Sequence, residues 1–96
     1  MKIYNYKTLK ELIDNLVQIV DLDEQLLQSK LERSWVEIIG PAAANSVTVT
    51  FYKNKVLYLK THSSTWRTEL LLRKREIIDR INQKFENEII KDINIH

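Results

Sequence analysis

Residues 47–60 have the sequence VTVTFYKNKVLYLK, in which apolar and polar side chains alternate on either side of a short polar centre. A period of two is typical of a half-buried strand, so it predicts a strand over residues 47–52 with Val47, Val49 and Phe51 facing inward. Residues 53–55 predict a turn, and Leu57 and Leu59 continue the inward face on the returning strand. The other side of this β-hairpin would carry Thr48, Thr50, Tyr52, Val56, Tyr58, Lys60 and His62.

A helix and a third strand are expected after the hairpin. Ser63 or Ser64 can cap a long helix running to about Phe85, because a serine oxygen accepts a hydrogen bond from the free N–H groups of a first turn. The apolar face of that helix would consist of Trp66, Leu70, Leu71, Ile77, Ile78, Ile81 and Phe85. A last strand is expected over roughly residues 89–95, with Ile93 and Ile95 on one side.

Two helices are expected before the hairpin. Thr8 and Glu11 have the spacing of a capping box, and apolar residues recur at helical spacing from Leu9 to Val20. Residues 21–23 predict a turn, after which Asp23 would cap a second helix. The apolar stripe of that helix would be Leu27, Leu31, Trp35 and Ile38.

Gly40 and Pro41 predict the end of the second helix, because glycine accepts a left-handed conformation and proline cannot continue the helix. Residues 42–46 would then form a connector. The expected order is ααββαβ in a single domain over residues 1–96. This order predicts an α+β fold of two layers, with helices on one face of a three-stranded sheet.

Composition excludes several classes of protein. The 96 residues contain no cysteine, which excludes disulfides, thiolate zinc sites and thiol catalysis. The single glycine, Gly40, excludes phosphate loops built on spaced glycines. No apolar run approaches the roughly 18 residues of a membrane helix, and residues 1–7 lack the apolar segment of a signal peptide. We therefore expect a soluble, cytoplasmic binding module with no cofactor, no metal, no membrane contact and no enzymatic activity.

Charge is distributed unevenly around a formal net charge of +2. Residues 1–40 hold five basic and seven acidic side chains, whereas residues 60–84 hold seven basic and three acidic ones. This asymmetry permits a polyanion on one side and a protein partner on the other, without requiring either.

Several segments together resemble the DciA family. They are Trp35-Val-Glu-Ile-Ile-Gly40, the hairpin, residues 57–70 (LYLKTHSSTWRTEL), Lys74 and Ile81-Asn82. The resemblance runs from Leu9 to the final strand, and its specificity lies in the order and spacing of these segments taken together.

The resemblance implies a fold similar to a KH domain and a role in loading the replicative helicase DnaB onto DNA. It therefore implies a helicase partner and weak contact with single-stranded or forked DNA. The sequence lacks the GxxG loop with which a KH domain clamps a nucleic-acid backbone. It also ends at His96 without the basic tail of longer members, so we expect a short, tail-less member that uses other contacts.

Residues 62–67 are the first candidate site. A helix N-terminus attracts anions, so Ser63, Ser64 and Arg67 could hold a phosphate. The alternative is that a serine only caps the helix. A catalytic trio of His62, Ser63 and Glu69 is rejected, because no carboxylate orients the histidine and no glycine-bearing oxyanion turn follows.

Lys74 is the second candidate, because helical spacing puts it among Leu70, Ile77, Ile78 and Ile81. Its stem could cover the edge of the core while its ammonium reaches water. Alternatively, it could contact an anion or a carboxylate where the helix overhangs the sheet. The spacing leaves both interpretations open.

The remaining basic residues form a diffuse set that permits only weak, salt-sensitive nucleic-acid binding. Trp35 and Trp66 are expected in the core, and Tyr52 and Tyr58 are the candidates for stacking on bases. The expected nucleic-acid or partner-binding residues are Lys53, Lys55, Tyr58, Lys60, Ser63, Ser64, Arg67, Arg73 and Lys74.

Two functions follow as hypotheses. The first is a module that engages the DnaB-type helicase and assists its loading. The second is a KH-like RNA-binding accessory protein that acts without a helicase, for which a preference for RNA over DNA would be the distinguishing property. The oligomeric state stays open.

Overall fold

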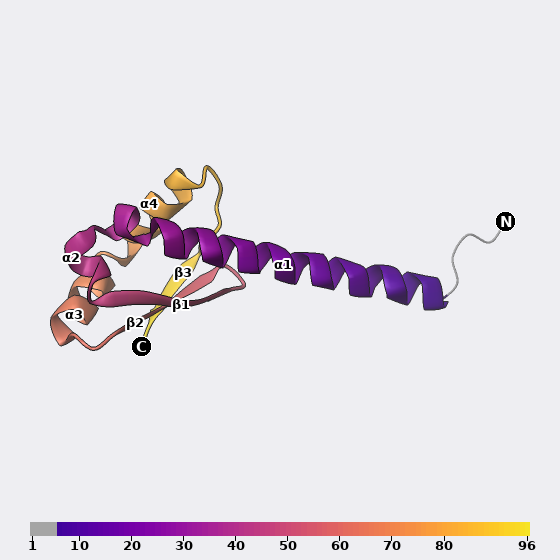
Figure 1. Cartoon of the computed structure of the whole chain (residues 1–96), viewed down its shortest axis with the longest axis horizontal. Coiled ribbons are helices and arrows are strands. Elements are labelled where there is room, and N and C mark those ends of the chain that lie inside the picture. Colours follow the sequence, from indigo (N-terminus) through magenta and orange to yellow (C-terminus); the bar gives the residue numbers. More distant parts are fainter. Residues whose placement is uncertain (1–5) are drawn as a thin grey trace.

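The computed structural model describes residues 6–96, apart from the side chains of residues 6–7 and 14–22. The elements are α1 (Tyr6–Ile39), α2 (Pro41–Ala44), β1 (Val47–Lys53), β2 (Val56–Thr61), α3 (Ser64–Leu72), α4 (Lys74–Lys84) and β3 (Asp92–Ile95). The strands form one sheet in the order β1-β2-β3, in which β1 is antiparallel and β3 parallel to β2 (Figure 1). The predicted α+β fold with a three-stranded sheet is confirmed.

One continuous helix, α1, replaces the two predicted helices. The turn expected at residues 21–23 is wrong, because α1 runs unbroken from Tyr6 to Ile39. Neither glycine nor proline occurs between these residues. Relative to alanine, an aspartate inside a helix lowers the stability of the helix by less than about 1 kcal/mol. The described part of α1 is already helical at Tyr6, so Thr8 lies within the helix.

The predicted helix stop at Gly40 is confirmed. Gly40 has a φ of 95°, in the region that favours glycine, and Pro41 begins the four-residue helix α2 inside the expected connector. No helix of the part of the chain that the structure describes, α1 included, has the apolar length that crossing a bilayer requires.

The core lies between one face of the sheet and the second half of α1 together with α3 and α4. Trp35 is 5% exposed, and its indole N–H donates to the carbonyl of Val47 at 2.8 Å, which confirms its expected place in the core. The largest side chains with almost no exposure are Leu31, Val47, Leu57, Leu59, Ile81, Ile90 and Ile93. Leu57 and Leu59 therefore face inward, as their alternation predicted.

A β-bulge in β1 reverses the predicted orientation of the side chains that follow it in this strand. The register of β1 against β2 shifts between Val49 and Phe51, which leaves Thr50 without a partner in the ladder. One extra residue moves every later side chain to the other face of the sheet. Phe51 is consequently 47% exposed and Tyr52 is 5% exposed, so the predicted orientations of both are wrong.

The predicted helix from residue 63 or 64 to about Phe85 is divided at Arg73. Arg73 has φ −104° and ψ 14°, so α3 ends at Leu72 and α4 begins at Lys74. An unbroken helix would hold Lys74 inside the apolar stripe over the sheet. With the break, the Lys74 side chain is 34% exposed and reaches the edge strand β3.

The last strand is shorter than predicted. Ile89 and Ile90 are buried, but β3 begins only at Asp92. Asn82 of α4 holds the segment before the strand, because its Oδ1 accepts from the N–H groups of both isoleucines at 3.0 Å and its Nδ2 donates to the Ile90 carbonyl at 3.0 Å.

Candidate functional site

The face of the sheet opposite the helices, called here the open face, carries an aromatic pair. The bulge turns Phe51 onto this face opposite Tyr58, and the ring centroids lie 5.8 Å apart at an angle of 54°. Lys53 and Lys60 are exposed on the same face. Two adjacent rings flanked by two lysines could stack on bases and attract phosphates.

The hairpin tip next to this face gathers further positive charge. Asn54 and Lys55 have φ values of 53° and 62°, as a two-residue turn between twisted strands requires. The N–H of Lys91 donates to the Lys55 carbonyl at 2.7 Å, which places a third lysine beside Lys53 and Lys55. Sequence reasoning missed Lys91 because only the parallel pairing of β3 with β2 brings it to the tip.

The tip is held against α1 by side chains of that helix. The Asn54 N–H donates to Glu24 Oε2 at 2.7 Å, and the Tyr52 N–H donates to Gln28 Oε1 at 3.2 Å. These contacts cover the outer edge of β1, whose N–H groups would otherwise be open to another strand. They also fix the tip lysines relative to the body.

The start of α3 confirms the capping interpretation of Ser63. Its Oγ accepts from the Trp66 N–H at 3.1 Å, and the Arg67 guanidinium donates to the Thr61 carbonyl at 2.9 Å. Ser64 is the first residue of the helix and is exposed. Ser63 and Arg67 therefore tie the end of β2 to α3.

At the break between α3 and α4, both cations have carboxylate partners. Lys74 Nζ lies 3.2 Å from Asp92 Oδ1, which is the carboxylate contact that sequence analysis left open, and Arg73 Nε lies 3.0 Å from Glu69 Oε1. The backbone N–H of Ile93, and secondarily Lys74, hold the pKa of Asp92 below its ordinary value.

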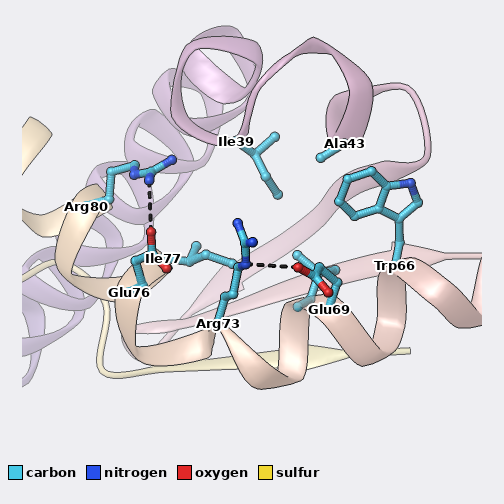
Figure 2. Close-up of a pocket in the computed structure, with 9 residues that line it drawn as sticks. Ile39, Ala43, Trp66, Glu69, Arg73, Glu76, Ile77 and Arg80 are labelled. Carbon is cyan, nitrogen blue, oxygen red and sulfur yellow. Dashed lines mark hydrogen bonds and ion pairs between the residues drawn. The ribbon is translucent and has the colours of Figure 1, made fainter.

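A shallow hollow lies between α3, α4 and the end of α1 (Figure 2). Its lining residues are Ile39, Ala43, Trp66, Glu69, Leu70, Arg73, Glu76, Ile77 and Arg80. Trp66 is half-buried and projects its indole beside Ala43, so this tryptophan lies at the edge of the core and not inside it. Arg80 bonds Glu76 Oε1 at 3.1 Å and the Ile38 carbonyl at 3.0 Å.

The structure thus separates the predicted residues into three places. Lys53, Lys55, Tyr58 and Lys60 lie on the open face and its tip, while Ser63, Ser64 and Arg67 lie at the start of α3. Arg73 and Lys74 lie at the α3–α4 break. The missed members are Lys91 and Phe51, and no sequence signal for the bulge reveals Phe51. Within residues 6–96 as described, no group of three or more side chains is placed to hold a metal ion.

Comparison with known proteins gives two matches. The family model described as "Dna[CI] antecedent, DciA" matches residues 8–95, which include every strand of the sheet. A protein of Corynebacterium glutamicum (strain R), named "UPF0232 protein", is 31% identical over 62 residues. The match covers 65% of this chain and 35% of that protein, so the chain spans about a third of the length of this relative.

Proposed function

Because the chain belongs to the DciA family, we propose that it binds the replicative helicase of DnaB type and assists its loading at DNA replication, with weak binding to DNA. The match over residues 8–95 carries this proposal, since it includes both the sheet and the helices that pack on it. The protein would act by binding alone, without a cofactor and without making or breaking a covalent bond.

The open face is the proposed contact for single-stranded DNA. Stacking on Phe51 and Tyr58 would contribute about 1–3 kcal/mol per base, whatever the base. Lys53 and Lys60, with Lys55 and Lys91 at the tip, would attract phosphates. Because few cations are involved, the affinity should be low and should fall as salt is added.

The α3–α4 break is the proposed contact for the helicase. Leu71 and Leu72 are 54% and 78% exposed there, next to Arg73 and the hollow that Trp66 lines. Tryptophan and arginine are enriched among the residues that dominate the affinity of protein interfaces, and the two exposed leucines would add apolar contact area beside them. This surface lies on the helices, so the helicase and DNA could bind together.

The helicase proposal is tested by sizing chromatography of the full chain mixed with the cognate DnaB hexamer. A complex is expected at tens of micromolar, and Leu72→Ser should weaken it about tenfold or more, as loss of a well-placed apolar contact does. Phe51→Ser, which changes an exposed residue on the other face, is the matched control and should bind as the native chain does. Absence of a complex with the native chain would contradict the proposal.

The nucleic-acid proposal is tested by fluorescence anisotropy with DNA and RNA of the same single-stranded sequence over a range of salt concentrations. Phe51→Ser and Tyr58→Ser should each weaken binding to DNA, whereas Leu72→Ser should not. A marked preference for RNA would indicate contacts with 2′-hydroxyl groups and would favour the RNA-binding accessory function instead.

A further inference from the structure

The third strand adds one polar side chain to the aromatic pair of the open face. Phe51 pairs with Tyr58 across β1 and β2, and Tyr58 pairs with Asn94 across β2 and β3. Paired residues of adjacent strands point to the same face of a sheet. Ile93 is buried under the helices, so its neighbour Asn94 lies on the open face, where it is exposed. Phe51, Tyr58 and Asn94 therefore form one row across the sheet, called here the central row.

Cations flank the central row on both sides. The row nearer the hairpin tip carries Lys53 and Asp92, and the row on the other side carries Lys60. Asp92 is the only acid among the described residues of the three strands, and its carboxylate lies 3.2 Å from Lys74 Nζ. Lys53 and Lys60 form no ion pair within the part of the chain that the structure describes. A nucleotide on the central row would thus have an ammonium group on each side for its phosphates.

The tilt of the aromatic rings separates the bases that they could hold. The ring planes of Phe51 and Tyr58 meet at 54°, so one flat base cannot stack on both. A base on Tyr58 would have Phe51 on one side and Asn94 on the other, because the outer strands lie about 4.8 Å to either side of β2. An edge of that base, with its hydrogen-bonding groups, would therefore come next to the Asn94 amide.

The Asn94 amide is available for such a contact. It takes part in no hydrogen bond with another described residue. An amide offers an acceptor oxygen and a donor N–H side by side. Adenine has the complementary pair, a donor beside an acceptor, on both its Watson–Crick and its Hoogsteen edge, whereas the other three bases have one on the Watson–Crick edge alone. Adenine therefore matches this amide whichever edge it presents.

We propose that Asn94 gives the open face a preference for adenine in single-stranded DNA, by hydrogen bonding to the edge of a base that stacks on Tyr58. The inference rests on the proposed function, because it requires the open face to bind single strands. The two rings would hold any base and the lysines any phosphate, so Asn94 is the residue of the central row that distinguishes bases. The site would bind every single strand weakly and adenine-rich strands more tightly.

Fluorescence anisotropy of the full chain with three single strands, each made of about twelve adenine, cytosine or thymine nucleotides, tests the preference. The native chain should bind the adenine strand about fivefold more tightly than the other two, the lower end of what one bidentate contact with a base provides. Asn94→Ala should lose this difference and bind all three strands about as the native chain binds thymine. Asn94→Leu, which keeps the size of the side chain, should do the same. Asn45→Ala, which changes an exposed asparagine at the end of α2, is the matched control and should keep the preference.

The outcomes separate this inference from the proposed function. Binding of the native chain to all three strands with equal affinity overturns the preference and leaves DNA binding by the open face intact. A preference for adenine that persists in both Asn94 variants would come from stacking alone and would overturn the role of Asn94. No binding to any strand would overturn the proposed DNA contact together with the preference. Melting temperatures of the variants show that each is folded under the conditions of the measurement.

Discussion

The hydroxyl of Tyr52 donates a hydrogen bond of 2.6 Å to the main-chain carbonyl of Ile89, and both residues are buried. The bond joins β1 to the segment that leads into β3, across 37 positions of sequence. It exists because the bulge turns Tyr52 inward, so one irregularity in β1 both fixes the last strand and exposes Phe51. The one-residue insertion in β1 therefore determines both the buried hydrogen bond of Tyr52 and the exposed position of Phe51 on the open face.

Replacing Tyr52 with phenylalanine should lower the free energy of unfolding by about 1–3 kcal/mol, because a buried carbonyl loses its hydrogen-bond partner. Urea denaturation measures the change. Tyr58→Phe removes the same atom from the open face and should cost less than about 0.5 kcal/mol, as surface changes usually do. Equal losses in the two variants would contradict the assignment of the hydrogen bond.

The same residue predicts a response to alkaline pH. Burial, with smaller contributions from Glu24 and Asp23, raises the pKa of Tyr52 above its ordinary value near 10. The unfolded chain then releases this proton at a lower pH than the folded chain does. The stability contributed by Tyr52 is therefore full below pH 10 and lost as pH rises through the folded pKa.

The measurement compares native chain and Tyr52→Phe in urea between pH 8 and pH 11. The difference between their free energies of unfolding should stay constant to about pH 10 and then narrow. If the difference in free energy of unfolding stays the same from pH 8 to pH 11, Tyr52 has the same pKa in the folded and unfolded states.

The hairpin shows what sequence patterns could and could not predict. Alternation correctly placed Val47, Leu57 and Leu59 in the core, because period-two burial is a local property. It failed at Phe51 and Tyr52, because a bulge inserts one residue without any change of composition. The Tyr52 hydroxyl donates to the carbonyl of Ile89, a contact that sequence spacing does not contain.

In the candidate site, too, contacts between residues close in sequence were predictable and contacts between distant elements were not. The cap by Ser63 was predictable because its partner, Trp66, is three residues away. The partners of Lys74 and Arg67 depend on where β3 and the end of β2 lie, so periodicity could mark Lys74 as unusual without naming Asp92. The turn predicted at residues 21–23 was wrong because aspartates favour turns only weakly without glycine or proline.

Asn82 should be intolerant of a nearly isosteric change. Its amide accepts from two backbone N–H groups and donates to the Ile90 carbonyl, so both ends of the side chain are used. Asn82→Asp keeps the acceptor oxygen but sets a carboxylate oxygen against that carbonyl. Asn82→Ala removes all three side-chain bonds, and only the Ile89 N–H keeps a second acceptor, the Asn87 carbonyl. Each should lower the free energy of unfolding by about 2–4 kcal/mol, measured by thermal or urea unfolding.

As a control, Gln83→Ala changes an exposed neighbour on α4 and should alter the free energy of unfolding by less than about 0.5 kcal/mol. Near-native stability of Asn82→Ala would be incompatible with these bonds.

The ion pair of Lys74 and Asp92 should contribute less than about 1 kcal/mol, because both side chains are partly exposed. The backbone N–H of Ile93 is the larger cause of the lowered pKa of Asp92 and Lys74 is a smaller one, so the pH dependence of stability reflects both contacts. The folded chain keeps the carboxylate ionised at a pH where the unfolded chain takes up a proton. This stability is therefore present above the unfolded pKa, near 4, and is lost as pH falls through the lower folded pKa. The free energies of unfolding of native chain and Asp92→Asn, measured by urea denaturation, should thus differ at pH 7 and become equal in acid. A difference that persists in acid would show that it does not come from the ionised Asp92 carboxylate.

The same pair distinguishes a structural role of Lys74 from a role in binding. Lys74→Met and Asp92→Asn both break the ion pair, but only the first removes the cation while keeping most of the apolar stem. If Lys74 also contacts the helicase, as its position next to Arg73 and Leu72 suggests, Lys74→Met should weaken that complex several-fold more than Asp92→Asn does. Measurement of both variants against the same helicase preparation, together with their melting temperatures, separates the two effects. Equal binding by the two variants would assign Lys74 to the fold alone, and the contact with the helicase would then rest on the exposed leucines.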